Sequence, residues 1–73
     1  MGLVDQLAAS QLPSPARRRS IRMDAKASLR DVADELGVTP TTVMRWERGN
    51  AEPRRSRAVA YRDLLAALQA VSA

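Results

Sequence analysis

Residues 28–49 read SLRDVADELGVTPTTVMRWERG, and this stretch contains two short helical patterns separated by a break at Gly37. Ser28 is expected to cap the first helix, because a serine oxygen accepts hydrogen bonds from the free N–H groups of a first turn. Asp31, three residues later, makes a variant of the capping box. The apolar residues that follow at helical spacing are Val32, Ala33 and Leu36. Glycine then favours an ending in a left-handed conformation.

The second pattern begins at Thr39, which is expected to cap a helix whose first position is Pro40. Val43 and Trp46 are three residues apart and share one face, which we expect to be buried. The helix ends at Arg48-Gly49. The residues left wholly or partly on the other face are Thr41, Thr42, Met44, Arg45 and Arg48. Two helices of about eight residues joined by a tight turn predict a helix-turn-helix motif.

At these residues the chain resembles the Xre-type (phage repressor and Cro-like) helix-turn-helix DNA-binding domains. The matching residues are Val32-Ala33, Leu36-Gly37-Val38, Thr39, Val43, Trp46-Glu47-Arg48-Gly49 and Pro53. With its flanking helices the resemblance extends over residues 14–68. It implies a lambda-repressor-like fold and a protein that binds double-stranded DNA, with residues 39–48 in the major groove.

The composition independently indicates a small all-α domain. The 73 residues allow one domain with a modest core, Trp46 and Tyr61 are the two aromatic residues, and no alternating β-branched run predicts a strand. We expect a compact bundle of about five short helices.

The absence of cysteine and histidine excludes several functions. It removes disulfides, thiol catalysis, the usual zinc sites and imidazole acid–base chemistry, and no serine or threonine has an evident base beside it. We therefore expect no enzyme, no metal and no cofactor. Eleven of the twelve basic residues are arginine, and the net charge is +4. Arginine suits bidentate recognition of phosphate groups and guanine edges.

The ends of the chain carry the less specific patterns. Residues 1–13 are expected to form a helical extension of a DNA-binding domain over residues 14–73, with a break at Pro13-Ser14-Pro15. Apolar residues in 3–12 recur at helical spacing, and this stripe either covers the core or binds another chain. No signal peptide and no apolar run of about 20 residues is present, so we expect a cytoplasmic protein.

The helix expected after Ser14 carries a run of arginines, Arg17 to Arg19. Two interpretations are open: the run is a solvated face, or Arg18 and Arg19 contact DNA phosphates, which position a protein without reading sequence. The resemblance implies that Arg22 forms a partly buried ion pair with Glu47, a structural pair close to Trp46.

Two positions depart from the family's pattern. Lys26 stands where relatives often have glycine, and we expect the link here to be more helical than usual, because lysine disfavours the left-handed conformation. Leu29 replaces a glutamine that helps to anchor many relatives to a phosphate. Arg30 is expected to supply that contact instead.

The resemblance assigns base reading to Thr41 and Arg45, and we expect Met44 and Arg48 to join them. Arginine donates two hydrogen bonds to guanine O6 and N7, whereas threonine and methionine suit a thymine methyl. For Arg45 and Arg48, a merely solvent-facing charge is the alternative. The remaining residues expected on DNA phosphates are Ser28, Arg30, Thr39, Thr42, Arg54 and Arg55.

A final amphipathic helix is expected from about Ser56. Its apolar residues are Ala58, Tyr61, Leu64, Leu65 and Leu68. This face should pack on the helix of residues 15–24 and on Trp46. Its far end, with Leu68 and Val71, is a candidate contact with a partner or a second copy.

These observations favour a sequence-specific double-stranded DNA-binding protein, most simply a small transcriptional regulator or repressor that acts as a homodimer on a palindromic site. Two alternatives remain open. One is an excisionase or architectural factor from a phage or mobile element. The other is a protein-interaction module, such as an antitoxin-like or inhibitor protein, that uses the same fold. A membrane role is disfavoured, because basic and apolar residues do not share one long helix.

Overall fold

The computed structural model describes residue 3 and residues 11–72, and helices dominate this part of the chain. Within residues 11–72 there are four, namely α2 (Pro15–Asp24), α3 (Leu29–Leu36), α4 (Pro40–Arg48) and α5 (Arg55–Ser72). The expected all-α fold is confirmed. The additional helix expected over residues 3–12 falls largely outside the described residues.

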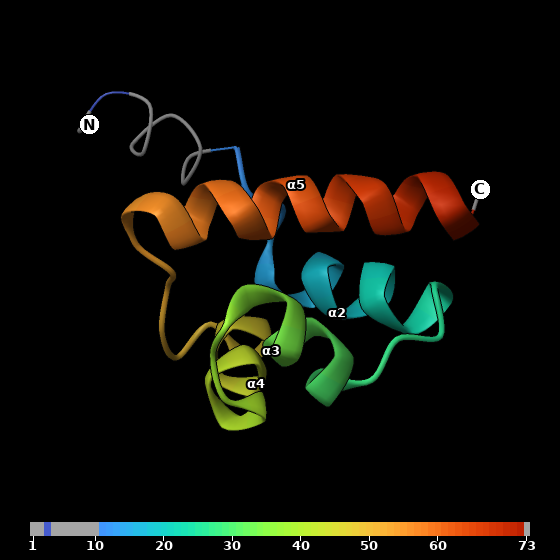
Figure 1. Ribbon diagram of the computed structural model, residues 1–73, viewed down its shortest axis with the longest axis horizontal. Coiled ribbons are helices and arrows are strands. Elements are labelled where there is room, and N and C mark those ends of the chain that lie inside the picture. Colours follow the sequence, from blue (N-terminus) through green and yellow to red (C-terminus); the bar gives the residue numbers. More distant parts are fainter. Residues whose placement is uncertain (1–2, 4–10, 73) are drawn as a thin grey trace.

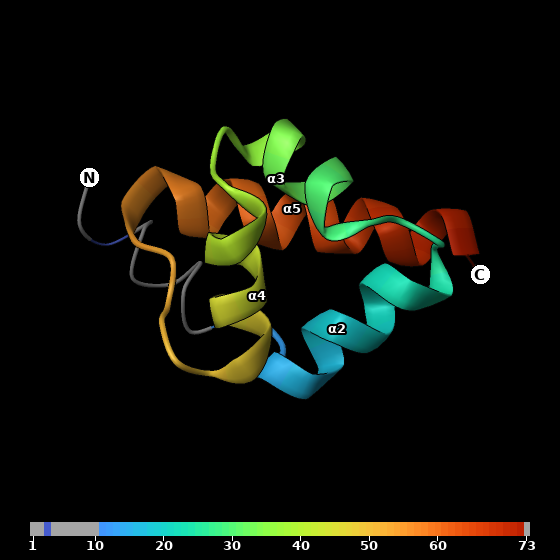
Figure 2. The same cartoon turned by 90° about the horizontal axis from the view of Figure 1, so that it is seen from below.

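The long helix α5 lies along one side of the molecule, and the three shorter helices lie on its other side (Figure 1). Seen from below, α4 lies between α3 and α2 (Figure 2). Helix α5 packs on α2, as expected, and also on α3. It meets Trp46 of α4 through Tyr61, whose ring centre is 4.9 Å from that of Trp46. The buried core residues are Ile21, Val32, Ala33, Val43, Trp46, Ala58, Tyr61 and Leu65.

The first helix of the motif begins with the predicted capping box. The backbone N–H of Asp31 donates to Ser28 Oγ at 2.9 Å, and the backbone N–H of Ser28 donates to Asp31 Oδ2 at 2.9 Å. The hydrogen bond from the Ser28 backbone N–H, with a smaller contribution from the Ser28 side chain, holds the pKa of the Asp31 carboxyl below its usual value. Gly37 ends α3 with φ +69°, a conformation that costs glycine little.

The second helix of the motif begins and ends as its sequence predicts. Thr39 caps α4 by accepting a hydrogen bond from the backbone N–H of Thr42 at 3.2 Å, and Pro40 occupies the first helical position. Gly49 closes α4 with φ +75°. Because both ends are fixed by local hydrogen bonds, the outward residues of α4 occupy defined positions along a rigid rod.

The link between α2 and α3 differs from the expectation. Lys26 has φ +58°, so the prediction of a more helical link is wrong. Its backbone N–H donates to Met23 O at 2.9 Å, and that of Ala27 donates to Arg22 O at 3.1 Å. These bonds satisfy carbonyls at the end of α2. The gain offsets the strain of a lysine in the left-handed region.

Replacing Lys26 by glycine should therefore stabilise the protein. The left-handed conformation costs a non-glycine residue about 1–2 kcal/mol, and the greater freedom of glycine in the unfolded chain offsets part of the gain. We expect Lys26→Gly to raise the free energy of unfolding by about 0.5–1 kcal/mol in urea denaturation. The matched control is Ala25→Gly, at φ −83°, which should lower it. A loss of stability in Lys26→Gly would contradict the strain.

The hydroxyl of Tyr61 is buried in the core. Tyr61 is 1% exposed, and its oxygen has no hydrogen-bond partner among the described residues. Burial, with a smaller contribution from the Glu47 charge, raises the pKa of Tyr61 to about 12. The ring therefore contributes apolar packing to the core, whereas the hydroxyl is a cost.

This burial predicts a specific loss of stability at alkaline pH. The pKa of Tyr61 in the folded protein lies above the value of about 10 in the unfolded chain. The contribution of the neutral Tyr61 to the free energy of unfolding is therefore complete below pH 10 and is lost as the pH rises toward 12. At pH 11, midway between the two pKa values, the loss should be about 1–1.5 kcal/mol, and it should be absent in Tyr61→Phe. Urea denaturation of both proteins at pH 7 and pH 11 measures the difference. Equal alkaline losses in the two proteins would contradict this account.

Candidate nucleic-acid interface

The helix α4 presents two distinct faces. Its inner face is buried through Val43, Trp46 and Glu47. On its outer face, the expected base-reading residues Thr41, Arg45 and Arg48 are exposed, and Met44 is half-buried. Thr42, which is expected to contact a phosphate, is also half-buried. The expected division of α4 into packing residues and outward polar residues is therefore present, and the outward residues form one surface.

A hollow of about 460 Å³ lies beside this surface, between α2 and α4. Arg19 of α2 and Arg48 of α4 line it, together with Met44 and with Leu29 at the start of α3. Both arginines are exposed, and neither forms an ion pair within the described part of the chain. The hollow thus brings one expected phosphate contact, Arg19, close to two expected base contacts.

The ion pair implied between Arg22 and Glu47 is present at the back of this hollow. Arg22 Nε and Nη2 donate to the Glu47 carboxylate at 2.6 and 3.0 Å. Arg22 Nη1 also donates to Ala27 O at 2.9 Å. The hydrogen bonds that Arg22 donates to the Glu47 carboxylate raise the pKa of the Arg22 guanidinium, while burial acts in the opposite direction. Three of the five guanidinium donors are used, so the pair joins α2, the link before α3, and α4.

Two side-chain hydroxyls that are expected to contact DNA phosphates, those of Ser28 and Thr39, also cap helices. Ser28 and Thr39 accept backbone hydrogen bonds through their side-chain oxygens. A hydroxyl that accepts keeps one O–H to donate, so capping leaves Ser28 able to bind a phosphate oxygen. Thr39 and Thr42 have their hydroxyls 3.0 Å apart, so one of the two donates to the other. Arg30 is exposed on the first turn of α3.

Arg18 lies elsewhere than expected. Its side chain is 4% exposed, and its guanidinium donates to Pro13 O, Trp46 O and both carboxylate oxygens of Glu52. This geometry corrects the expectation that Arg18 contacts a DNA phosphate, because four of its five donors are already bonded to protein atoms. Of the run Arg17 to Arg19, the two outer members remain exposed.

Glu52 is a structural residue that sequence reasoning did not single out. It lies in the loop between α4 and α5, where its carboxylate meets Arg18 at 2.7 and 2.8 Å. The hydrogen bond from Arg18 lowers the pKa of the Glu52 carboxyl. The signal available in the sequence was an acidic residue next to Pro53, which does not indicate its partner 34 residues earlier.

A second basic cluster, Arg54, Arg55 and Arg57, lies where this loop leads into α5. Arg54 and Arg55 are exposed and form no ion pair within residues 11–72. Arg57 donates to the Gly37 carbonyl at 3.3 Å, so it joins the start of α5 to the turn of the motif. Arg54 and Arg55 are therefore the members of this cluster that remain available for a ligand.

A family model described as helix-turn-helix (HTH_3) matches residues 19–66, which is well over half of the chain. The chain belongs to this family of Xre/lambda-repressor-like DNA-binding domains. The match contains α3, the turn and α4 entirely, so the resemblance noted for residues 28–49 is confirmed. No curated protein and no solved structure matches the chain.

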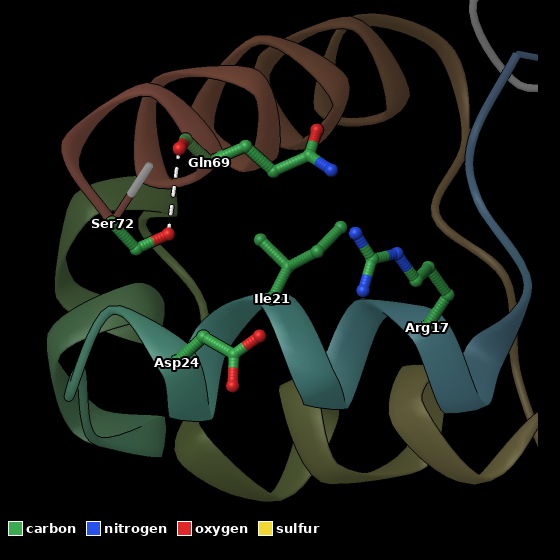
Figure 3. A pocket seen from close by; sticks show the side chains of 5 residues that line it. All are labelled: Arg17, Ile21, Asp24, Gln69 and Ser72. Carbon is green, nitrogen blue, oxygen red and sulfur yellow. Dashed lines mark hydrogen bonds between the residues drawn. The ribbon is translucent and has the colours of Figure 1, made fainter.

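Two further surface hollows among the described residues of this helix-turn-helix domain lie away from α4. One of about 310 Å³ lies between α2 and the far end of α5, with Arg17, Ile21, Asp24, Gln69 and Ser72 around it (Figure 3). Another of about 170 Å³ is lined by apolar residues of α3 and α5, with Asp31 and Glu35 at its edge. Neither includes an outward residue of α4.

Two other kinds of feature are absent from the described residues. These residues contain no helix that is both long and apolar enough to cross a membrane. They also contain no group of three or more acidic side chains arranged to hold a metal ion.

Proposed function

We propose that the protein is a sequence-specific double-stranded DNA-binding protein, a small transcriptional regulator that places residues 39–48 in the major groove. The observation that carries the proposal is the two-faced helix α4, whose buried face fixes the orientation of an exposed face rich in arginine and threonine. A rigid helix of this kind fits the major groove and aims side chains at base edges.

In this arrangement Arg45 donates to a guanine, while Thr41 and Met44 meet bases on either side of it. Arg48 reads a base edge at the end of α4. The residues proposed to contact phosphates are Ser28, Arg30, Thr39, Thr42, Arg19, Arg54 and Arg55. Arg18 has no place among them, because its guanidinium is bonded within the protein.

One domain of this size covers a short site, since a single module buries about 600–1,000 Å² of protein surface on DNA. We propose that two copies bind a palindromic site with half-sites about one helical turn apart. Val71, at the end of α5, is 78% exposed and is a candidate for the contact between copies.

A duplex-binding titration against salt tests the proposal. Contacts to about six phosphates predict that the logarithm of the association constant falls with the logarithm of the salt concentration, with a slope near −5. Fluorescence anisotropy of a labelled duplex of mixed sequence, measured from low to physiological salt, gives that slope. Absence of binding to any duplex at low salt would overturn the proposal and favour the protein-interaction module.

A further inference from the structure

We propose that Arg18 and Glu52 are a positioning pair, which orients the loop of residues 49–54 so that Arg54 and Arg55 reach the DNA backbone. The inference rests on the proposed function, because it concerns residues of the same DNA-binding face. It assigns a role to a buried arginine and a loop carboxylate that base reading and phosphate binding leave unexplained.

Four segments of the chain meet at the Arg18 side chain. Its Nε donates to Pro13 O at 2.8 Å, before α2. Its Nη1 donates to Trp46 O at 3.1 Å, in the last turn of α4. Its guanidinium carbon is 6.0 Å from the centre of the Tyr61 ring, on α5. Glu52 adds the loop between α4 and α5, so one side chain connects the base-reading helix with the segment that leads to Arg54.

Glu52 provides directional contacts in the middle of this loop, whose two ends are held by backbone hydrogen bonds to α4 and to the first turn of α5. Within the described part of the chain, no backbone–backbone hydrogen bond involves residues 51–53. Ala51 and Pro53 pack inward, but apolar contacts do not fix orientation. The two hydrogen bonds from Arg18 to the Glu52 carboxylate are parallel and bidentate, a geometry that fixes both distance and angle. Arg54 follows two residues later.

The stability of the domain alone does not require a charged pair at Arg18 and Glu52. Arg18 is 3% exposed, and a buried ion pair is often no more stabilising than apolar residues of similar volume. The Glu52 carboxylate itself is 56% exposed and adds negative charge beside arginines expected on phosphates. By simple electrostatics that charge weakens DNA binding. A positioning role predicts the opposite effect, and the sign of the change distinguishes the two.

The experiment is a double-mutant cycle between Glu52 and Arg54, measured by anisotropy with a labelled mixed-sequence duplex of about 20 base pairs. We expect Glu52→Ala to lower affinity about 3–10-fold at low salt and to reduce the magnitude of the salt slope by about one or more. Arg54→Ala should lower affinity similarly in the wild-type background. In the Glu52→Ala background it should have less than about half of that effect on the logarithm of affinity.

Asp34→Ala is the matched control for the removed charge, because Asp34 is exposed on α3 and forms no ion pair within residues 11–72. It should leave affinity unchanged or slightly raised. Circular dichroism at the assay temperature verifies that each variant is folded. If Glu52→Ala leaves Arg18 unpaired and unfolds the domain, the double variant Arg18→Met/Glu52→Ala replaces it in the cycle, since it removes both charges together.

Affinity that is unchanged or raised in folded Glu52→Ala, with the effect of Arg54→Ala undiminished, would overturn the positioning role while the proposed function stands. Wild-type protein that binds no duplex would overturn the proposed function and this inference together. Reduced affinity with a diminished Arg54 effect supports both.

Discussion

Arg45→Ala is expected to lower the affinity for the cognate duplex by about 5–150-fold, which corresponds to the 1–3 kcal/mol that a bidentate arginine–guanine contact contributes to discrimination. Affinity for mixed-sequence DNA should change little. The reason is the position of Arg45, which is exposed on the outer face of α4 and one turn after Thr41. The cognate duplex is obtained by selecting bound sequences from a random pool, and both affinities are measured by anisotropy at one salt concentration.

Arg54→Ala is the matched control for this result. Arg54 is an equally exposed arginine outside α4, so its loss should weaken binding to both duplexes by similar factors. Equal losses on the two duplexes in Arg45→Ala would mean that Arg45 is another phosphate contact. The symmetry of the selected sites additionally shows whether two copies bind.

Glu47→Ala should have the largest effect on stability. It leaves the Arg22 guanidinium, whose side chain is 12% exposed, without the carboxylate that it meets at 2.6 Å. Removing one partner of a buried pair costs about 3–5 kcal/mol, a large share of the 5–15 kcal/mol that stabilises a typical domain. We expect the urea midpoint to fall sharply, or the helical signal to be lost at 25 °C. Circular dichroism with urea denaturation measures both.

A double variant distinguishes two causes of the instability of Glu47→Ala: the unpaired Arg22 charge and the lost side-chain volume. Arg22→Met/Glu47→Leu replaces both charges with apolar side chains of similar size, and such replacements are often neutral or stabilising. It should recover most of the stability lost in Glu47→Ala. If the double variant is as unstable as the single one, the pair stabilises the domain through its hydrogen bonds, including the one to Ala27 O, and not by avoiding an isolated charge.

The sequence predicted the motif well because its signals are local. A serine with an aspartate three residues later, a threonine before a proline, and a glycine at the end of each helical pattern fix the helix ends through contacts within a few residues. The periodicity of Val43 and Trp46 then determines which face of α4 is buried. The exposed residues of the interface follow by elimination.

The contacts made over long sequence separations were not predictable in the same way. Three consecutive arginines lie in the first half of α2, and their spacing does not reveal that Arg18 bonds to a loop carboxylate 34 residues away. Lys26 was misjudged for a related reason. Its intrinsic preference argues for a helical link, but the hydrogen bonds that end α2 require the left-handed conformation.

The two faces of α4 also bear on how this domain is able to change its target. Thr41, Arg45 and Arg48 are exposed, whereas the contacts that hold α4 in place come from Val43, Trp46 and Glu47. Under the proposed function, we expect substitutions at the first set to alter which bases are recognised and to leave the scaffold intact, since exposed positions away from structural contacts usually change stability by less than about 0.5 kcal/mol. Variant libraries at those three positions should then yield folded domains with new target sequences.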